Sequence, residues 1–213
     1  MLASARVNRT FQRYAKVRNH NRMTGKEAAE RILRTSGIHD VSVQRVSGNL
    51  TDHYDPRSKI LRLSDATYHA DSVAAVGVAA HECGHAIQHA RGYVPLAIRG
   101  NLVPIANFGS VAAWPLILIG LFMNSSVSML LIRLGILAFS ASVLFQIVTL
   151  PVEFNASRRA VKILEDTGML YSDEVAGTKK VLKAAALTYV AGAAASILQL
   201  FRLILIGGRR NDE

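Results

Sequence analysis

The chain of 213 residues has a single cysteine, Cys83, which excludes an internal disulfide, and we expect it to be a small buried residue. Aromatic residues make up only 7% of the sequence, and no nucleic-acid motif accompanies the net charge of +10. The N-terminus is polar and basic, which argues against a cleavable signal peptide. A disulfide-stabilised secreted domain and a nucleic-acid-binding protein are therefore both disfavoured, and we expect no nucleic-acid partner.

Long apolar stretches are present instead. Half of all residues (50%) are hydrophobic, and many of them gather in residues 102–123, 127–150 and 184–206. Each stretch can cross a bilayer, which takes about 20 mostly apolar residues. The alternative, three buried helices of a soluble core, would be unusual in so short a chain. We therefore predict a multi-pass protein of the cell membrane, with the lipid bilayer as its surroundings.

The pentapeptide His81–His85 (HECGH) lies in an apolar run that predicts a buried helix. One helical turn separates His81 from His85, so both imidazoles face the same side. Two neutral imidazoles at this spacing can share one Zn²⁺, and Glu82 beside them can take a proton from water and give it to a leaving amine. The motif predicts a zinc hydrolase, most often a metallopeptidase; two satisfied histidines of a core helix are the alternative.

A catalytic zinc needs a third protein ligand. His89 continues the spacing, but it lies about 12 Å from His81 along a straight helix and cannot share the ion. We expect His89 either to support the site from outside the ligand set or to be a surface residue. Glu153 is the best candidate, because it directly follows an apolar stretch, where a charge needs a partner or a metal. On spacing alone, pairing of Glu153 with Arg158 or Arg159 is an equal alternative.

The distribution of basic residues predicts the orientation. Seven Lys and Arg residues fall within residues 6–26 with no acidic residue among them, and three more lie in 158–162. Basic segments beside membrane helices mark the cytoplasmic side and face anionic lipid. We therefore expect a cytoplasmic loop over residues 153–183, an active site facing the cytoplasm, and residues 124–126 on the far side. A complete third crossing would put Arg209 and Arg210 outside the cell, against this rule. We therefore leave open whether the third stretch crosses completely.

The segment before the zinc motif predicts a small folded portion. Residues 24–27 have a capping-box pattern that opens a helix through Thr35, and residues 41–46 and 59–63 alternate as strands. A protease can hold an extended peptide by adding it to a sheet edge, and Lys59–Leu63 is our candidate edge.

Three polar residues, His53, Tyr54 and Asp55, directly precede Pro56. His53 or Tyr54 could stabilise the oxyanion of a tetrahedral intermediate, a role that either residue type can take. Ordinary turn chemistry around Asp55 and Pro56 explains these residues equally well.

Three segments together resemble the YugP-like membrane zinc metallopeptidases, and the resemblance extends from about Phe11 to Ile206. They are residues 50–57 (LTDHYDPR), 78–89 (VAAHECGHAIQH) and 150–159 (LPVEFNASRR). More distantly, the chain is similar to the HtpX and CAAX-prenyl-protease group of membrane gluzincins.

The resemblance implies that His81, His85 and Glu153 bind one Zn²⁺ per chain and that Glu82 is the general base. The distant group has an acidic residue four positions after the ligand glutamate, where this chain has Ser157. Asn155 and Arg158 are the candidates for its supporting role. The family pattern also begins with a membrane helix, which has no counterpart before the basic segment of this sequence.

The predicted fold is mainly α: a membrane-embedded helical bundle with a small α+β zincin-like catalytic portion, whose short sheet precedes the zinc helix. The catalytic portion is expected in residues 1–100 and the membrane helices in residues 101–213. The predicted function is that of a membrane-bound zinc metalloendopeptidase acting on membrane-associated proteins or peptides. A catalytically inactive zinc-binding membrane scaffold and a non-peptidase zinc amidase are the alternatives.

Overall fold

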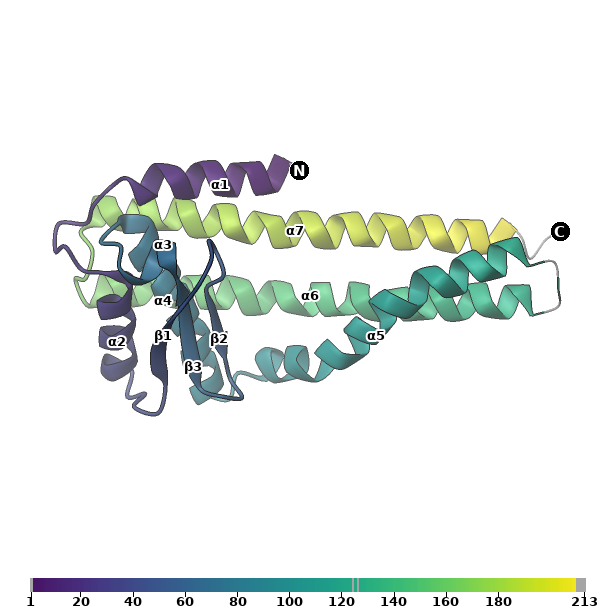
Figure 1. The fold of residues 1–213 in the computed structure, drawn as a ribbon, viewed down its shortest axis with the longest axis horizontal. Coiled ribbons are helices and arrows are strands. Elements are labelled where there is room, and N and C mark those ends of the chain that lie inside the picture. The colour runs from purple at the N-terminus through teal and green to yellow at the C-terminus, as the bar shows by residue number, and fades with distance from the viewer. Residues whose placement is uncertain (1, 124, 126, 210–213) are drawn as a thin grey trace. The chain divides into compact units, whose positions relative to one another are not determined.

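The computed structural model describes residues 2–123, 125 and 127–209. The described elements follow the order α1 (Leu2–Ala15), α2 (Gly25–Thr35), β1 (Ser42–Val46), β2 (His53–Asp55), β3 (Ile60–Ser64), α3 (Asp65–Tyr68), α4 (Val73–Ala90), α5 (Val94–Phe122), α6 (Ser128–Asp166) and α7 (Ser172–Arg209) (Figure 1). The fold is mainly helical with one small sheet, which confirms the predicted class. Residues 153–183 are largely helical, because the ends of α6 and α7 fill most of this segment.

The chain divides into two compact units. Unit 1 combines residues 1–93 with residues 152–188, and unit 2 combines residues 94–151 with residues 189–213. The zinc motif and Glu153 therefore belong to the same unit, although the whole of residues 94–151 separates them in sequence.

The small sheet of unit 1 has the strand order β1-β3-β2. β1 pairs with β3 in parallel, and β2 pairs with β3 in antiparallel fashion. The prediction that Lys59–Leu63 forms a free edge is therefore wrong, because the backbone groups of β3 are used on both sides. The available edges belong to β1 and to the short strand β2.

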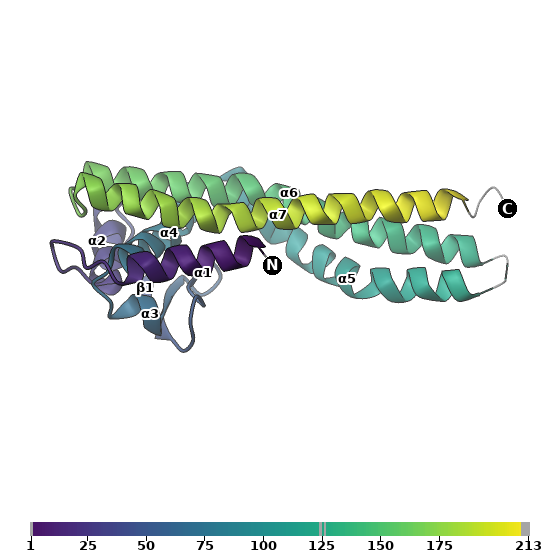
Figure 2. The same cartoon turned by 90° about the horizontal axis from the view of Figure 1, so that it is seen from above.

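Helix α4 is the most buried helix of unit 1, and it lies between the sheet and the segments of α6 and α7 that belong to the same unit (Figure 2). The hydroxyl of Ser72 caps it by accepting a hydrogen bond from the Ala75 N–H at 3.1 Å. Cys83 is fully buried as a free thiol, and burial raises its pKa well above the usual range. Helix α2, whose capping box at Thr24 and Glu27 forms as predicted, packs in the same core.

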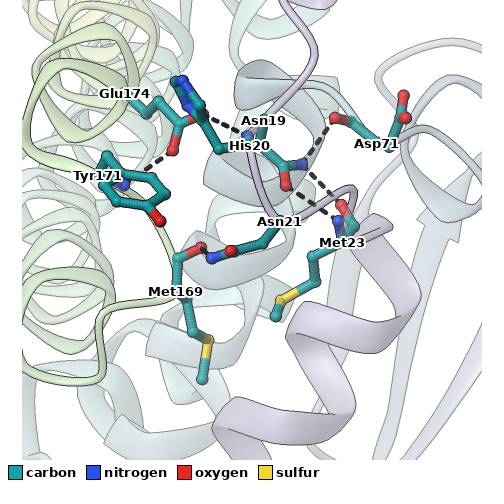
Figure 3. A network of polar contacts seen from close by, with 8 residues as sticks. All are labelled: Asn19, His20, Asn21, Met23, Asp71, Met169, Tyr171 and Glu174. Atoms are coloured by element: carbon teal, nitrogen blue, oxygen red, sulfur yellow. Dashed lines mark hydrogen bonds and ion pairs between the residues drawn. The ribbon is translucent and has the colours of Figure 1, made fainter.

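The segment between α1 and α2 forms hydrogen bonds to residues at the beginnings of α4 and α7 (Figure 3). Asn19 is completely buried, and its Nδ2 donates to the backbone oxygens of Met23 at 2.8 Å and Asp71 at 2.6 Å. The N–H of His20 donates to the Glu174 carboxylate at 2.7 Å. Because Asp71 directly precedes the α4 cap and Glu174 lies in the first turn of α7, this segment fixes the beginnings of both helices.

Unit 2 contains most of the apolar stretches. Helices α5, α6 and α7 are each long and apolar enough to cross a membrane, and only 22%, 17% and 17% of their apolar windows are buried. Helices of a soluble core would be far more buried, so lipid is the fitting surrounding for these surfaces. Helix α5 contains Pro104 and Pro115 and is visibly bent (Figure 1). We predicted residues 124–126 to be exposed on the far side of the membrane. Residues 124 and 126 lie outside the described part of the chain, and Ser125 is exposed.

Close helix contact in unit 2 depends on small and polar residues. A Cβ on Gly109 would lie only 2.3 Å from the backbone oxygen of Ala138, so glycine lets α5 approach α6. The Gln146 amide of α6 donates to the Ser196 hydroxyl of α7 at 2.9 Å. Ser196 ends a run of small residues in α7, Ala191–Ser196.

Candidate metal centre

Three side chains converge where α4 meets α6. The Oε2 atom of Glu153 lies 3.2 Å from the Nε2 of His81 and 3.6 Å from the Nε2 of His85. Two ligands bound to one tetrahedral zinc at about 2.0–2.1 Å are about 3.3 Å apart. The potential ligand atoms of all three residues lie within 4.8 Å of one another. The donor set and its spacing therefore fit a zinc ion.

Gly84 makes this convergence sterically feasible. A Cβ at position 84 would lie 2.5 Å from the backbone oxygen of Ala156, closer than a side chain can approach. The glycine inside the zinc motif thus lets the α4 backbone lie directly against α6. Since Ala156 is three residues beyond Glu153, the contact brings the carboxylate onto the two histidines.

The Nδ1 atom of each histidine, on the side away from Glu153, also has a hydrogen-bond partner. The Nδ1 of His85 lies 3.0 Å from the Oε1 of Gln88, and the Nδ1 of His81 lies 3.1 Å from the Oγ of Ser157. An amide oxygen can only accept, so His85 donates its Nδ1 proton to Gln88, and the neutral form of His85 has an unprotonated Nε2 on the side of Glu153. This is the tautomer that binding of a metal through Nε2 requires.

Gln88 is completely buried and connects α4 to α6. Its Nε2 donates to the backbone oxygen of Val152 and to the Oδ1 of Asn155, both at 2.9 Å. These two donations fix the orientation of the amide and leave its oxygen for His85. The Oδ1 of Asn155 also accepts from the Nε of Arg159 at 2.7 Å. Val152 and Asn155, on either side of Glu153, therefore orient the His85 ring through Gln88.

The electrostatics of the centre are dominated by burial and by Glu153. Glu153 is 3% exposed, and its carboxylate contacts both His81 and His85. Burial acts to lower the pKa of His85, but the hydrogen bond to Glu153 and the charge of Glu82 outweigh it and raise the pKa. A metal ion at the centre would replace the Nε2 proton of the charged His85 imidazole, because a metal binds the neutral imidazole.

Glu82 lies between the two histidines in sequence and is 8% exposed. Its carboxylate has no hydrogen-bond donor among the described residues, in contrast to the carboxylate of Glu153. A carboxylate in this position remains able to accept a proton from water.

The other predicted site residues lie in several places. The Tyr54 hydroxyl contacts the Nδ1 of His89 at 2.8 Å and so joins β2 to the last turn of α4. Burial and the nearby charges of Asp40 and Asp55 raise the pKa of Tyr54 to about 12, so it stays protonated near neutral pH. His53 is exposed and its Nδ1 contacts the backbone oxygen of Thr51 at 2.8 Å.

The sequence signal identified neither Gln88 nor Ser157 as part of the site. Asn155, a predicted supporting residue, is linked to His85 through Gln88. Arg158 is exposed and lines a groove on unit 1 instead. Ser157 stands where the distant gluzincins have an acidic residue, and that position could have drawn attention to it.

Comparison with known proteins identifies the family of the chain. A family model described as "Putative neutral zinc metallopeptidase" matches residues 1–208. The "Putative membrane protease YugP" of Bacillus subtilis (strain 168) is 46% identical over 211 residues, which cover 99% of this chain and 92% of that protein. No solved structure shows a significant match to the chain.

Proposed function

Because the chain belongs to the neutral zinc metallopeptidase family whose model matches residues 1–208, we propose that it is a membrane-bound zinc endopeptidase. His81, His85 and Glu153 hold one Zn²⁺, and Glu82 is the general base. The proposed substrates are peptide bonds of membrane-associated proteins or peptides. The name of the curated relative and the three apolar helices both support membrane association.

One observation carries the proposal: the Glu153 oxygen lies 3.2 and 3.6 Å from the two Nε2 atoms of the H-E-x-x-H histidines. A structural ion pair would need only one of these contacts. Glu153 comes from a distant part of the chain, and its distances from both histidines fit ligands of one tetrahedral ion.

In the proposed mechanism each residue of the chain has a separate task. Zinc, when bound, polarises the scissile carbonyl and makes water more acidic. Glu82 takes a proton from the attacking water and delivers it to the nitrogen of the leaving amine. Gln88 and Ser157 hold the imidazoles of His85 and His81 through their Nδ1 atoms, so the ligands keep their orientation during turnover.

An extended substrate would bind at a free sheet edge. β2 is such an edge, and Tyr54 within it is bonded to His89 on the zinc helix. We therefore transfer the proposed peptide-binding edge from β3 to β2. Backbone hydrogen bonds to an added strand would give affinity that depends little on the substrate's sequence.

We place the active site on the cytoplasmic side. The basic residues between positions 6 and 26 and at positions 158–162 support this orientation through the positive-inside rule. Helix α7 is continuous from Ser172 to Arg209, which supports a complete third crossing despite the basic residue at its end.

Comparison of Glu82→Gln with the wild type tests the function. The full chain is purified in detergent, its zinc is measured by elemental analysis, and cleavage of a fluorogenic peptide library is followed. We expect about one zinc per chain in both proteins and a loss of cleavage on the order of 10²–10⁴-fold in the variant. Glu153→Ala is the companion variant and should lose zinc.

The alternatives give different results. An inactive zinc-binding scaffold would hold zinc but show no cleavage in either protein. A zinc amidase would hydrolyse small amides, such as formyl-peptides, and leave internal peptide bonds intact. Full zinc retention in Glu153→Ala would place the third ligand elsewhere.

A further inference from the structure

A groove of about 450 Å³ lies between α6 and α7 within unit 1. Phe154, Val161 and Leu182 contribute its apolar lining, and Phe154 is 44% exposed. Ala186 also lines the groove and already belongs to the apolar stretch 184–206. The groove therefore includes the part of α7 where a charged sequence gives way to an apolar one.

Four cationic and two acidic side chains line the same groove. Lys162 and Lys179 each pair with one of the acidic residues, at 3.0 and 2.7 Å. Arg158 and Lys183 have no acidic partner within the described ranges, although both line the groove. The groove thus combines an apolar lining with two uncompensated positive charges.

We propose that this groove binds an anionic phospholipid, with its headgroup phosphate at Arg158 and Lys183. A guanidinium and an ammonium group suit a phosphodiester, which accepts charge-assisted hydrogen bonds. The start of an acyl chain covers the exposed ring of Phe154, which would otherwise face water. This site does not depend on peptidase activity.

The composition of the groove favours a lipid over other anions. Free phosphate would leave the apolar lining unused. An acidic peptide would bring several carboxylates to a groove that, among the described residues, has only two unpaired cations and already contains Glu165 and Asp166, whereas a lipid headgroup brings one phosphate. Ser157 is a further lining residue, and its hydroxyl contacts His81 at 3.1 Å, so the bound lipid adjoins the candidate metal centre.

Native mass spectrometry of the full chain tests the site. The protein is reconstituted in nanodiscs of equal phosphatidylglycerol and phosphatidylcholine, transferred to a neutral detergent, and its retained lipids are counted. We expect the wild type to retain phosphatidylglycerol preferentially. The double variant Arg158→Gln/Lys183→Gln should lose this preference by about tenfold or more, as expected for two cations at an anionic headgroup.

Arg31→Gln/Arg34→Gln is the matched control, because it removes the same charge from exposed positions of α2 outside the groove. Arg158→Lys should preserve binding, which separates loss of charge from loss of fold. Equal retention of phosphatidylglycerol in the double variant and the control would overturn the proposal. Displacement of the lipid by millimolar inorganic phosphate or by polyglutamate would also overturn it, in favour of a free-anion or acidic-peptide site.

Discussion

Gln88→Met is the most informative substitution in the polar contacts behind the zinc ligands. Methionine has a similar length, but its thioether is only a weak acceptor for the Nδ1–H of His85, and it has no donor for the Val152 oxygen. Asn155 keeps its second hydrogen bond, from Arg159 at 2.7 Å. The substitution therefore isolates the link between His85 and the backbone next to Glu153.

The expected magnitude follows from burial. His85 is 7% exposed, so its freed N–H has little access to water, and an unsatisfied buried donor costs about 1–3 kcal/mol. The imidazole can then change tautomer or turn toward Glu153, and zinc must select the one arrangement with a free Nε2. Loss of such a supporting contact typically weakens metal binding by about 10–100-fold. We expect a similar loss of zinc affinity, with about 2–4 kcal/mol less stability.

Zinc affinity is measured by chelator competition on the purified full chain, and stability by denaturant unfolding of the zinc-free protein. Gln12→Met, at an exposed position of α1, is the matched control. A variant that loses stability but binds zinc within about threefold of the wild type would limit Gln88 to a structural role. Unchanged stability and affinity together would refute the reasoning.

Two further predictions concern the helix contact and the topology. Gly84→Ala should destabilise the protein by about 1–3 kcal/mol and weaken zinc binding, because its Cβ would meet the Ala156 oxygen at 2.5 Å. Thermal unfolding and chelator competition report both effects, and Gly100→Ala, where no atom lies within 4 Å of the new Cβ, should be neutral or slightly stabilising. A single cysteine at Ser125 in a Cys83→Ala background should react with an impermeant maleimide added from outside the cell. Labelling only after the cytoplasmic side is opened would reverse the proposed orientation.

Local patterns in the sequence were sufficient to predict α2, the helix of the zinc motif, the three apolar helices and two of the three strands, but not α1, α3 or the helical parts of residues 153–183. The capping box at Thr24 and the apolar run around His81 are each contained within a few residues, so propensity and periodicity identify them. β2 was missed, because three polar residues show no alternation. The central position of β3 also could not be read from its own residues, since strand order depends on pairing between distant segments.

The histidine pair of the site was evident from spacing alone, because a helix fixes the geometry of positions i and i+4. The assignment of Glu153 was ambiguous, since the arginines that follow it offered an equally good partner in sequence. Only the packing of α4 on α6 brings the carboxylate to His81 and His85. Gln88 and Ser157 have no distinctive motif, and their relevance depends on that same packing.

The divided chain of unit 1 has a consequence for biosynthesis. A ribosome that has completed α4 has produced two of the three candidate ligands, and Glu153 follows only after all of residues 94–151. In the proposed topology those residues cross the membrane twice, and the insertion machinery must accept both crossings before Glu153 can return to α4. That topology links maturation of the metal centre to membrane insertion, and a chain that ends before Glu153 lacks a complete centre.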